Sequence, residues 1–239
     1  MQLRQFRALT FDCYGTLIDW ETGIYEALRP WLDAQGLHLE RDQVLEAFAQ
    51  YETAQQTETP AMLYPQLLAE VHSRLATHWQ LAADTQAAQR FGASVHHWPA
   101  FDDSAASLSY LKQHYDLIIL SNVDRAGFAA SNARLGVEFD AIYTAEDIGS
   151  YKPNPANFTF MLNTLAERGI SKRDILHTAQ SLHHDHVPAT AAGLATCWID
   201  RRHAQGSFGA TARPLQDVET EFRFPSMAAL VDAHRAEQN

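Results

Sequence analysis

An aspartate at the end of a short apolar run is the first place where this sequence could do chemistry. Residues 8–11 suit a strand that is buried on both faces, and Asp12 follows directly. Gly15 permits a sharp turn, and Thr16 brings a hydroxyl close to the Asp12 carboxylate. A buried carboxylate is costly unless it is paired or used, so Asp12 is either a reactive group or a helix-capping residue. This stretch alone leaves both interpretations open.

Polar residues also follow the later apolar runs. Ser121 and Asn122 follow the run 117–120, Lys152 lies in the loop after 139–143, and Asp185 lies in the loop after 175–179. In a parallel sheet the carboxyl ends of the strands meet at one edge, where open α/β sheets bind their ligands. Each residue alone could simply cap a helix or contact solvent. Their joint arrangement is what predicts a site.

The apolar pattern of most of the chain alternates between strands and helices. Strands are predicted at 8–11, 117–120, 139–143, 175–179, 195–199 and just after 222, and helices at 104–114, 126–135, 157–167, 187–192 and up to 233. This alternation predicts an α/β fold with a Rossmann-like parallel sheet and right-handed crossovers. The stretch 206–214 is predicted to be a flexible loop from its composition.

Residues 20–98 show helical periodicity only. Helices are predicted over 20–34, 41–56, 61–79 and 86–95, with no convincing strand among them. We therefore divide the chain into an α/β core, residues 1–19 and 99–239, and an inserted helical domain, residues 20–98.

The composition limits the partners that the chain can have. A formal net charge of −11 argues against nucleic acid and anionic membranes. Two cysteines provide no disulfide framework, and we find neither a secretory leader nor an apolar run of membrane-spanning length. We therefore expect a cytoplasmic protein that binds neither nucleic acid nor membrane. A homodimer is left open as its assembly.

Four motifs, in this order, resemble the haloacid dehalogenase superfamily. They are FDCYGTLID at 11–19, LSN at 120–122, YKP at 151–153, and an acidic loop followed by AGLAT at 192–196. Tyr14 and the sequence TCWIDR at 196–201 look more like the 2-haloacid dehalogenase branch than like the phosphatases of the superfamily. The helical insertion is similar to the small cap domain of that family.

The resemblance implies a hydrolase that cleaves the carbon–halogen bond of a small 2-haloacid, an anionic small molecule, without a cofactor or a metal. Asp12 would attack carbon and form an aspartyl ester. Lys152 would keep Asp12 ionised, and Thr16 would donate a hydrogen bond to it. Asp185 would position the water that hydrolyses the ester.

The resemblance also implies a set of substrate-binding residues. Ser121, with N–H groups at a helix start, would bind the substrate carboxylate, and Asn122 would point toward the departing halide. Tyr14 stands where the phosphatases carry the acid that protonates a leaving alcohol, and a halide needs no such proton. Phe158 and Gln180 replace a Tyr and a Ser of the dehalogenase pattern, so we expect an altered substrate pocket.

One further residue of the dehalogenase pattern has no counterpart at the matching position. The dehalogenases place an Arg on an early helix of the cap, where our alignment has Tyr51 and Glu52. Arg29 and Arg41 lie elsewhere on the predicted cap. The sequence leaves open which residue replaces that Arg.

Three histidines surround Asp185. His183, His184 and His186 could form hydrogen bonds around this carboxylate or lie at the surface, and a structural metal site is a further alternative. Alternatives also remain for the activity: a Mg²⁺-dependent phosphatase of the same superfamily, a hydrolase of another small acid, or a binding protein without catalysis.

Overall fold

The computed structural model describes residues 1–205, 208–215 and 217–238. Within these ranges the chain forms one sheet of six parallel strands in the order β3-β2-β1-β4-β5-β6. This confirms the predicted α/β fold with a Rossmann-like core. The strands are β1 (Ala8–Phe11), β2 (Asp116–Ser121), β3 (Ala141–Thr144), β4 (Ile175–Ala179), β5 (Ala195–Ile199) and β6 (Phe222–Phe224).

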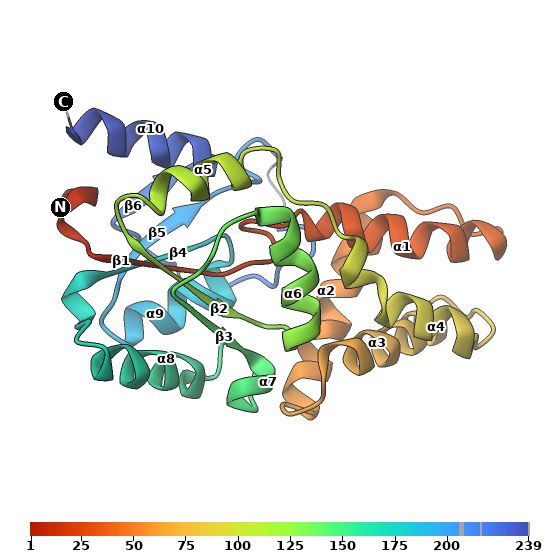
Figure 1. Cartoon of the computed structure of the whole chain (residues 1–239). Coiled ribbons are helices and arrows are strands. Elements are labelled where there is room, and N and C mark those ends of the chain that lie inside the picture. The colour runs from red at the N-terminus through yellow and green to blue at the C-terminus, as the bar shows by residue number, and fades with distance from the viewer. Residues whose placement is uncertain (206–207, 216, 239) are drawn as a thin grey trace.

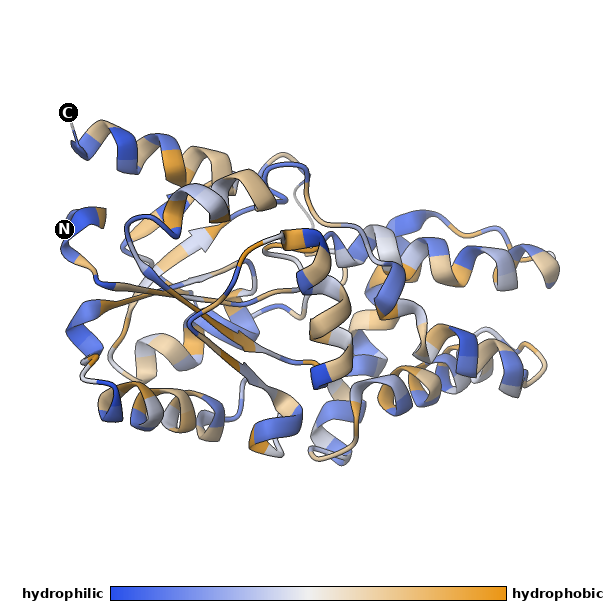
Figure 2. Ribbon diagram, viewed as in Figure 1, coloured by the Kyte–Doolittle hydropathy of each residue, from blue (hydrophilic) through white to orange (hydrophobic). Residues whose placement is uncertain are grey.

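Helices cover both faces of the sheet. In Figure 1, α5 (Ser104–Leu111) and α10 (Met227–Gln238) lie on one face, and α8 (Pro155–Glu167) and α9 (Val187–Ala191) lie on the other. Figure 2 shows hydrophilic and hydrophobic residues mixed along these outer helices, as expected for helices with one face on a sheet. The other elements of the core are α6 (Arg125–Leu135), α7 (Ala145–Ile148) and the short turns η1 (Leu3–Gln5), η3 (Lys172–Asp174) and η4 (Leu182–His186).

The central strand β1 is buried along its whole length. Its Leu9 and Phe11 belong to the apolar cluster that contains residues of α5 and α10, whereas Ala8 belongs to a second cluster with residues of α8 and α9. Neighbouring residues of a strand point to opposite faces, so β1 supplies both cores. The strand therefore ends in a fixed position, and Asp12 leaves the sheet at its carboxyl edge.

The stretch 20–98 is helical, as its periodicity predicts. It contains α1 (Trp20–Ala34), α2 (Arg41–Glu58), α3 (Tyr64–His78), α4 (Thr85–Gly92) and the turn η2 (Ser94–His97), and none of its described residues belongs to a named strand. Figure 1 shows these elements beyond the carboxyl ends of the strands. We call residues 20–98 the helical insertion; its status as a separate domain stays a prediction.

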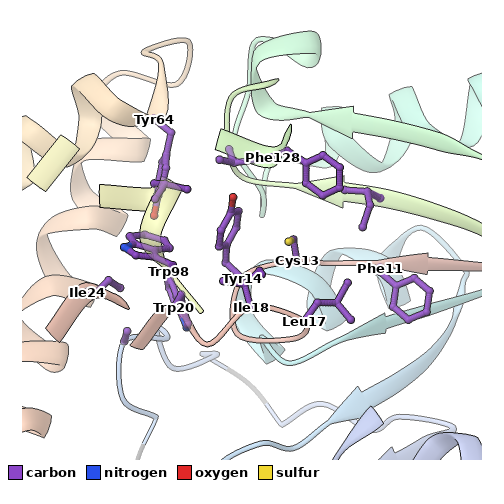
Figure 3. Packing of buried hydrophobic residues seen from close by; sticks show 14 of the residues in the cluster. Phe11, Cys13, Tyr14, Leu17, Ile18, Trp20, Ile24, Tyr64, Trp98 and Phe128 are labelled. Atoms are coloured by element: carbon purple, nitrogen blue, oxygen red, sulfur yellow. The ribbon is translucent and has the colours of Figure 1, made fainter. Parts of the chain in front are cut away.

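Aromatic side chains join the helical insertion to the core. Tyr14 follows β1, and its ring meets that of Trp98 edge to face at 5.5 Å. Figure 3 shows Tyr14 between Trp98 and Tyr64 on one side and Phe128 of α6 on the other. The apolar cluster is therefore continuous from the sheet into the insertion.

Several local predictions need correction. The third strand begins at Ala141 rather than at residue 139, because the Asp140 carboxylate accepts hydrogen bonds from the Leu117 backbone N–H (2.7 Å) and the Lys112 Nζ (2.6 Å). The helix α7 was not predicted; the Thr144 hydroxyl caps it. The loop after β4 is a π-helical turn, η4. Of the predicted loop 206–214, residues 206 and 207 lie outside the described ranges, and 208–214 contain no named helix or strand.

The helices were also searched for membrane spans. Among the residues that the structure describes, no helix is both long and apolar enough to cross a bilayer.

The contact between α3 and α4 provides a test of the packing. A Cβ atom on Gly92 would lie 2.4 Å from the Pro65 carbonyl oxygen, which cannot move without its helix. We expect Gly92→Ala to lower the free energy of unfolding by about 1–3 kcal/mol, measured by urea denaturation. Gln89→Ala, an exposed position of the same helix, is the control and should change it by less than about 0.5 kcal/mol. Equal stability of the two variants would contradict this packing.

Candidate active site

The Asp12 carboxylate is held on both of its oxygens. Its Oδ2 accepts a hydrogen bond from the Thr16 hydroxyl at 2.8 Å, and its Oδ1 accepts one from the Lys152 ammonium at 3.0 Å. The turn that places Thr16 there passes through Gly15 at a φ of +90°, where a side chain would be strained and would crowd Trp20. The structure therefore brings Asp12, Thr16 and Lys152 together, as the sequence predicts.

Lys152 lies at the centre of the site. Only 1% of its side chain is exposed, and its Nζ donates to Asp12 Oδ1, to Asp185 Oδ1 at 2.7 Å and to the Leu120 carbonyl oxygen at 2.8 Å. An ammonium group has three hydrogens, so all of its donors are used. The ammonium thus links the ends of β1 and β2 to the turn after β4.

The side chain of Asn122 fixes the backbone of Lys152. Its Oδ1 accepts from the Lys152 N–H at 2.7 Å, and its Nδ2 donates to the Lys152 carbonyl at 2.9 Å. Asn122 therefore positions the lysine, a role that the sequence analysis did not assign. It also lines the cavity beside Asp12, so its predicted place beside a leaving halide stays a prediction.

The charges of the site depend on one another. Burial raises the pKa of the Asp12 carboxyl, and the Lys152 ammonium opposes that rise. Burial alone would also raise the pKa of Asp185, but Lys152 and His177 more than reverse the effect and hold it well below its usual value. Burial disfavours the charge of Lys152, yet the two carboxylates raise its pKa. Asp185 and Lys152 therefore form a buried ion pair beside Asp12.

Asp185 has one oxygen in use and one available. Its Oδ1 accepts from Lys152 and from His177 Nε2 at 3.0 Å. Its Oδ2 is buried and has no hydrogen-bond partner among the described residues, and Asp185 lines the cavity. An unsatisfied buried acceptor is unfavourable, so this oxygen would gain from a bound water. The arrangement suits the predicted role of positioning water.

His177 is the site residue that the sequence analysis missed. It lies fully buried on β4, where its Nδ1 meets the Thr10 hydroxyl at 2.9 Å and its Nε2 donates to Asp185. In the sequence it stands out only as a polar residue within the predicted strand 175–179. A polar side chain in a strand buried on both faces requires a partner, and that requirement was the available signal.

The hydroxyl groups of Ser121 and Tyr14 differ in their hydrogen bonding. The Ser121 hydroxyl at the end of β2 is buried and has no partner within the described residues, but Ser121 does not line the cavity beside Asp12, so its contact with a substrate stays a prediction. The Tyr14 hydroxyl bonds to the Ser131 hydroxyl at 2.9 Å, and burial raises the Tyr14 pKa well above its usual value. Tyr14 is therefore a packed aromatic residue and a poor acid.

Phe158 needs correction as a substrate-binding residue. It is buried in the apolar cluster around α8, its ring lies 5.1 Å from that of His177, and it does not line the cavity beside Asp12. Phe158 packs against His177 instead. Gln180 does line the cavity; its backbone N–H donates to Thr16 Oγ1 at 2.9 Å, and its side-chain oxygen accepts from the Thr211 hydroxyl at 3.0 Å.

The three histidines near Asp185 do not surround a common point. His184 Nδ1 contacts the Ser181 hydroxyl at 3.2 Å, and His186 Nε2 donates to the Ala179 carbonyl at 2.9 Å. Burial lowers the pKa of His184 to about 3 and that of His186 to about 4, so both are neutral at pH 7. Across the described ranges, no group of three or more His, Cys, Asp or Glu residues is arranged to hold a metal ion.

A magnesium ion, which the phosphatase alternative requires, would have to share these carboxylates with an ammonium group. Mg²⁺ prefers octahedral oxygen ligands at about 2.0–2.1 Å. The Lys152 ammonium lies between Asp12 and Asp185 and takes up Oδ1 of each.

The residue after Asp12 is a buried cysteine. Cys13 is fully buried in the apolar cluster. Burial raises the pKa of its thiol well above the usual value, and the charge of Asp12 adds to the rise. Its thiol therefore stays protonated at neutral pH.

The site opens into a small cavity of about 30 Å³. Lys152 is the only Lys or Arg among the described residues that line it, and its donors are already used. A cavity of this size has room for a water molecule. Its lining residues are Asp12, Tyr14, Trp20, Glu52, Gln56, Tyr64, Asn122, Lys152, Gln180, Ser181, His184 and Asp185.

Comparisons with known proteins identify the family of this chain. Residues 6–178 match the family model of the haloacid dehalogenase-like hydrolases. The putative HAD-hydrolase YfnB of Bacillus subtilis (strain 168) is 27% identical over 209 residues, which cover 83% of this chain and 86% of that protein.

Solved structures resemble the whole chain. The L-2-haloacid dehalogenase PA0810 is 24% identical, with a TM-score of 0.76 over 97% of this chain and 99% of that one. The L-2-haloacid dehalogenase of Xanthobacter autotrophicus is 17% identical, with a TM-score of 0.76 over 96% and 98%. A magnesium-bound structure of YfnB is 20% identical, with the same TM-score over 96% and 99%. At these identities the structures establish a common fold.

The buried ion pair predicts a pH-dependent loss of stability. In Lys152→Met, Asp12 and Asp185 would be buried without their counter-charge, and their pKa values would rise. A folded protein whose carboxyl groups have raised pKa values loses stability as the pH rises through those values. In the native protein, by contrast, the lowered pKa of Asp185 adds stability at pH values above 3.8, the ordinary pKa of this group. We expect the deficit in unfolding free energy to grow from pH 4 to pH 7 and to reach about 3–5 kcal/mol.

Urea denaturation at pH 4, 5, 6 and 7 measures this deficit. Lys172→Met removes an exposed lysine and is the matched control. A deficit of the same size at every pH would show that Lys152 acts by packing alone.

Proposed function

This chain belongs to the haloacid dehalogenase-like hydrolase family, and from that membership we propose that it hydrolyses the carbon–halogen bond of a small 2-haloacid through an ester on Asp12. The observation that carries the proposal is the Asp12 carboxylate held by Thr16 and by a Lys152 ammonium that fills the space beside Asp185. The cytoplasmic location and a homodimeric assembly stay predictions.

In the first step, one oxygen of Asp12 attacks the carbon that bears the halogen. The C–O bond of an ester forms, the carbon–halogen bond breaks, and the halide leaves from the opposite side with its electron pair. Lys152 and Thr16 hold the carboxylate in one orientation, so little reorganisation is needed. The Ser121 hydroxyl has no partner among the described residues, and its proposed role is to bind the substrate carboxylate.

In the second step, water attacks the carbonyl carbon of the Asp12 ester. The free Oδ2 of Asp185 accepts the proton of that water and passes it to the departing alkoxide, so the 2-hydroxy acid leaves with the oxygen that came from Asp12 and Asp185 is ionised again. His177 and Lys152 keep Asp185 in place by their bonds to its Oδ1. Each turnover therefore puts one oxygen of water into the Asp12 side chain.

The phosphatase alternative has less support from the geometry. A phosphoryl group that approaches Asp12 brings negative charge, and such reactions normally use a divalent cation. Lys152 occupies the space between the two carboxylates, and Tyr14 is bonded to Ser131 and cannot serve as the acid for an alcohol. Attack at carbon meets neither difficulty.

The substrate class is tested by measuring the products. Halide should be released from at least one small 2-haloacid, with inversion at carbon, at a rate that EDTA does not change. Phosphate monoesters should release no phosphate with or without Mg²⁺. Mg²⁺-dependent release of phosphate, with no halide from any 2-haloacid, would replace this proposal by the phosphatase.

The two steps are tested separately by two variants. Asp12→Asn should abolish halide release, and single turnover in H₂¹⁸O should label the Asp12 side chain of the native protein. Asp185→Asn should slow the second step by about 100-fold or more, so that intact-protein mass spectrometry detects the accumulated ester. Asp102→Asn, an exposed position, is the control. Label that appears only in the product would mean that water attacks the substrate directly.

A further inference from the structure

Glu52 of α2 lies in the wall that the helical insertion places over the site. It is only 2% exposed and lines the same cavity as Asp12. Trp20, Gln56 and Tyr64 complete the insertion's part of this wall, and the core supplies the rest. A group displaced by Asp12 departs on the side away from Asp12, which is the side of the insertion.

The hydrogen bonds of Glu52 leave one of its oxygens for a ligand. Its Oε1 accepts from the Tyr64 hydroxyl at 2.9 Å and from Gln56 Nε2 at 3.0 Å. Both bonds end on Oε1, and no described residue bonds to Oε2. A proton on this carboxyl group therefore belongs on Oε2, from which it can be donated into the cavity.

The surroundings of Glu52 favour its protonated form. Burial raises the pKa of Glu52 to about 7, the bond from Tyr64 lowers it, and the charge of Asp12 raises it. The resemblance to dehalogenases leads us to expect an Arg near this position, and Arg cannot give up a proton. This chain has a carboxylic acid there instead.

From this placement we propose that Glu52 is the proton donor to the leaving group when Asp12 attacks carbon. The proposal rests on the displacement at Asp12 described above. The Asp12 oxygen forms the new C–O bond, the carbon–halogen pair of electrons leaves with the halogen, and Glu52 Oε2–H donates its hydrogen to the departing halide. Because the hydrogen halides are much stronger acids than Glu52, the proton returns to Glu52 as the halide ion is released, and Glu52 is ready for the next turnover.

The benefit of such a donor depends on the leaving group. Fluoride is the most basic halide and accepts the strongest hydrogen bond, whereas bromide leaves readily without one. Glu52 therefore allows the reaction to include fluorinated acids. Its loss should lower the rate of hydrolysis of a fluorinated acid far more than that of a brominated acid.

The other titratable groups that face this cavity keep one protonation state around pH 7. Burial keeps the pKa values of Tyr14 and Tyr64 far above 7. Lys152 stays charged, Asp185 stays ionised and His184 stays neutral. Asp12 must be ionised to attack, and Glu52 must be protonated to donate. With a fluorinated substrate, the rate should therefore fall at low pH as Asp12 is protonated and fall again above about pH 7 as Glu52 ionises.

The test compares Glu52→Gln with the native protein on 2-bromo-, 2-chloro- and 2-fluoropropionate. We expect kcat for fluoride release to fall by about 100-fold, and kcat for bromide release by less than about threefold. The alkaline fall of the fluoride rate should disappear in Glu52→Gln. Glu46→Gln, an exposed position of the same helix, is the control and should match the native protein.

Tyr64→Phe gives a second measurement that does not depend on the folding of Glu52→Gln. It removes a bond that lowers the pKa of Glu52, so the alkaline fall of fluoride release should move to higher pH. An equal loss for all three halides, a rise of KM alone, bromide release without fluoride release by the native protein, or an unmoved alkaline fall in Tyr64→Phe would each overturn the proposal. Absence of halide release from the native protein would instead refute the proposed function itself.

Discussion

The site depends on one buried ammonium group. Only 1% of the Lys152 side chain is exposed, so its charge needs the three acceptors that Asp12, Asp185 and Leu120 provide. Those acceptors lie at the ends of β1 and β2 and in the turn after β4. The ammonium therefore makes the geometry of three separate segments interdependent, and Asp12, the proposed nucleophile, is positioned by the same contacts that satisfy the buried charge.

The sequence predicted those parts of the structure that follow from periodicity and from the parallel sheet. The helix 20–34 was placed correctly because its apolar spacing begins just after Asp19, whose side chain caps it through the Thr22 N–H. Asp12, Lys152 and Asp185 were expected together because the carboxyl ends of parallel strands meet. Both arguments need only local patterns and a general rule of topology.

The parts that were missed depend on register and docking. His177 reaches Asp185 from β4, and its other nitrogen reaches Thr10, the residue paired with it on β1. The spacing of apolar residues does not specify which residues of β1 and β4 pair with each other. The wall around Glu52 depends likewise on how the helical insertion packs on the core through Tyr14 and Trp98, which no helical periodicity specifies.

The burial of Cys13 has a consequence for the survival of the protein during its own reaction. 2-Haloacids are alkylating agents, and thiolates are the protein groups that they modify most readily. Cys13 is next to Asp12, the proposed nucleophile, yet its thiol is buried in the apolar cluster and remains protonated. Cys197, the second cysteine of the chain, is buried as well. The proposed substrate therefore meets a reactive carboxylate and no reactive sulfur, which protects the catalyst from self-inactivation.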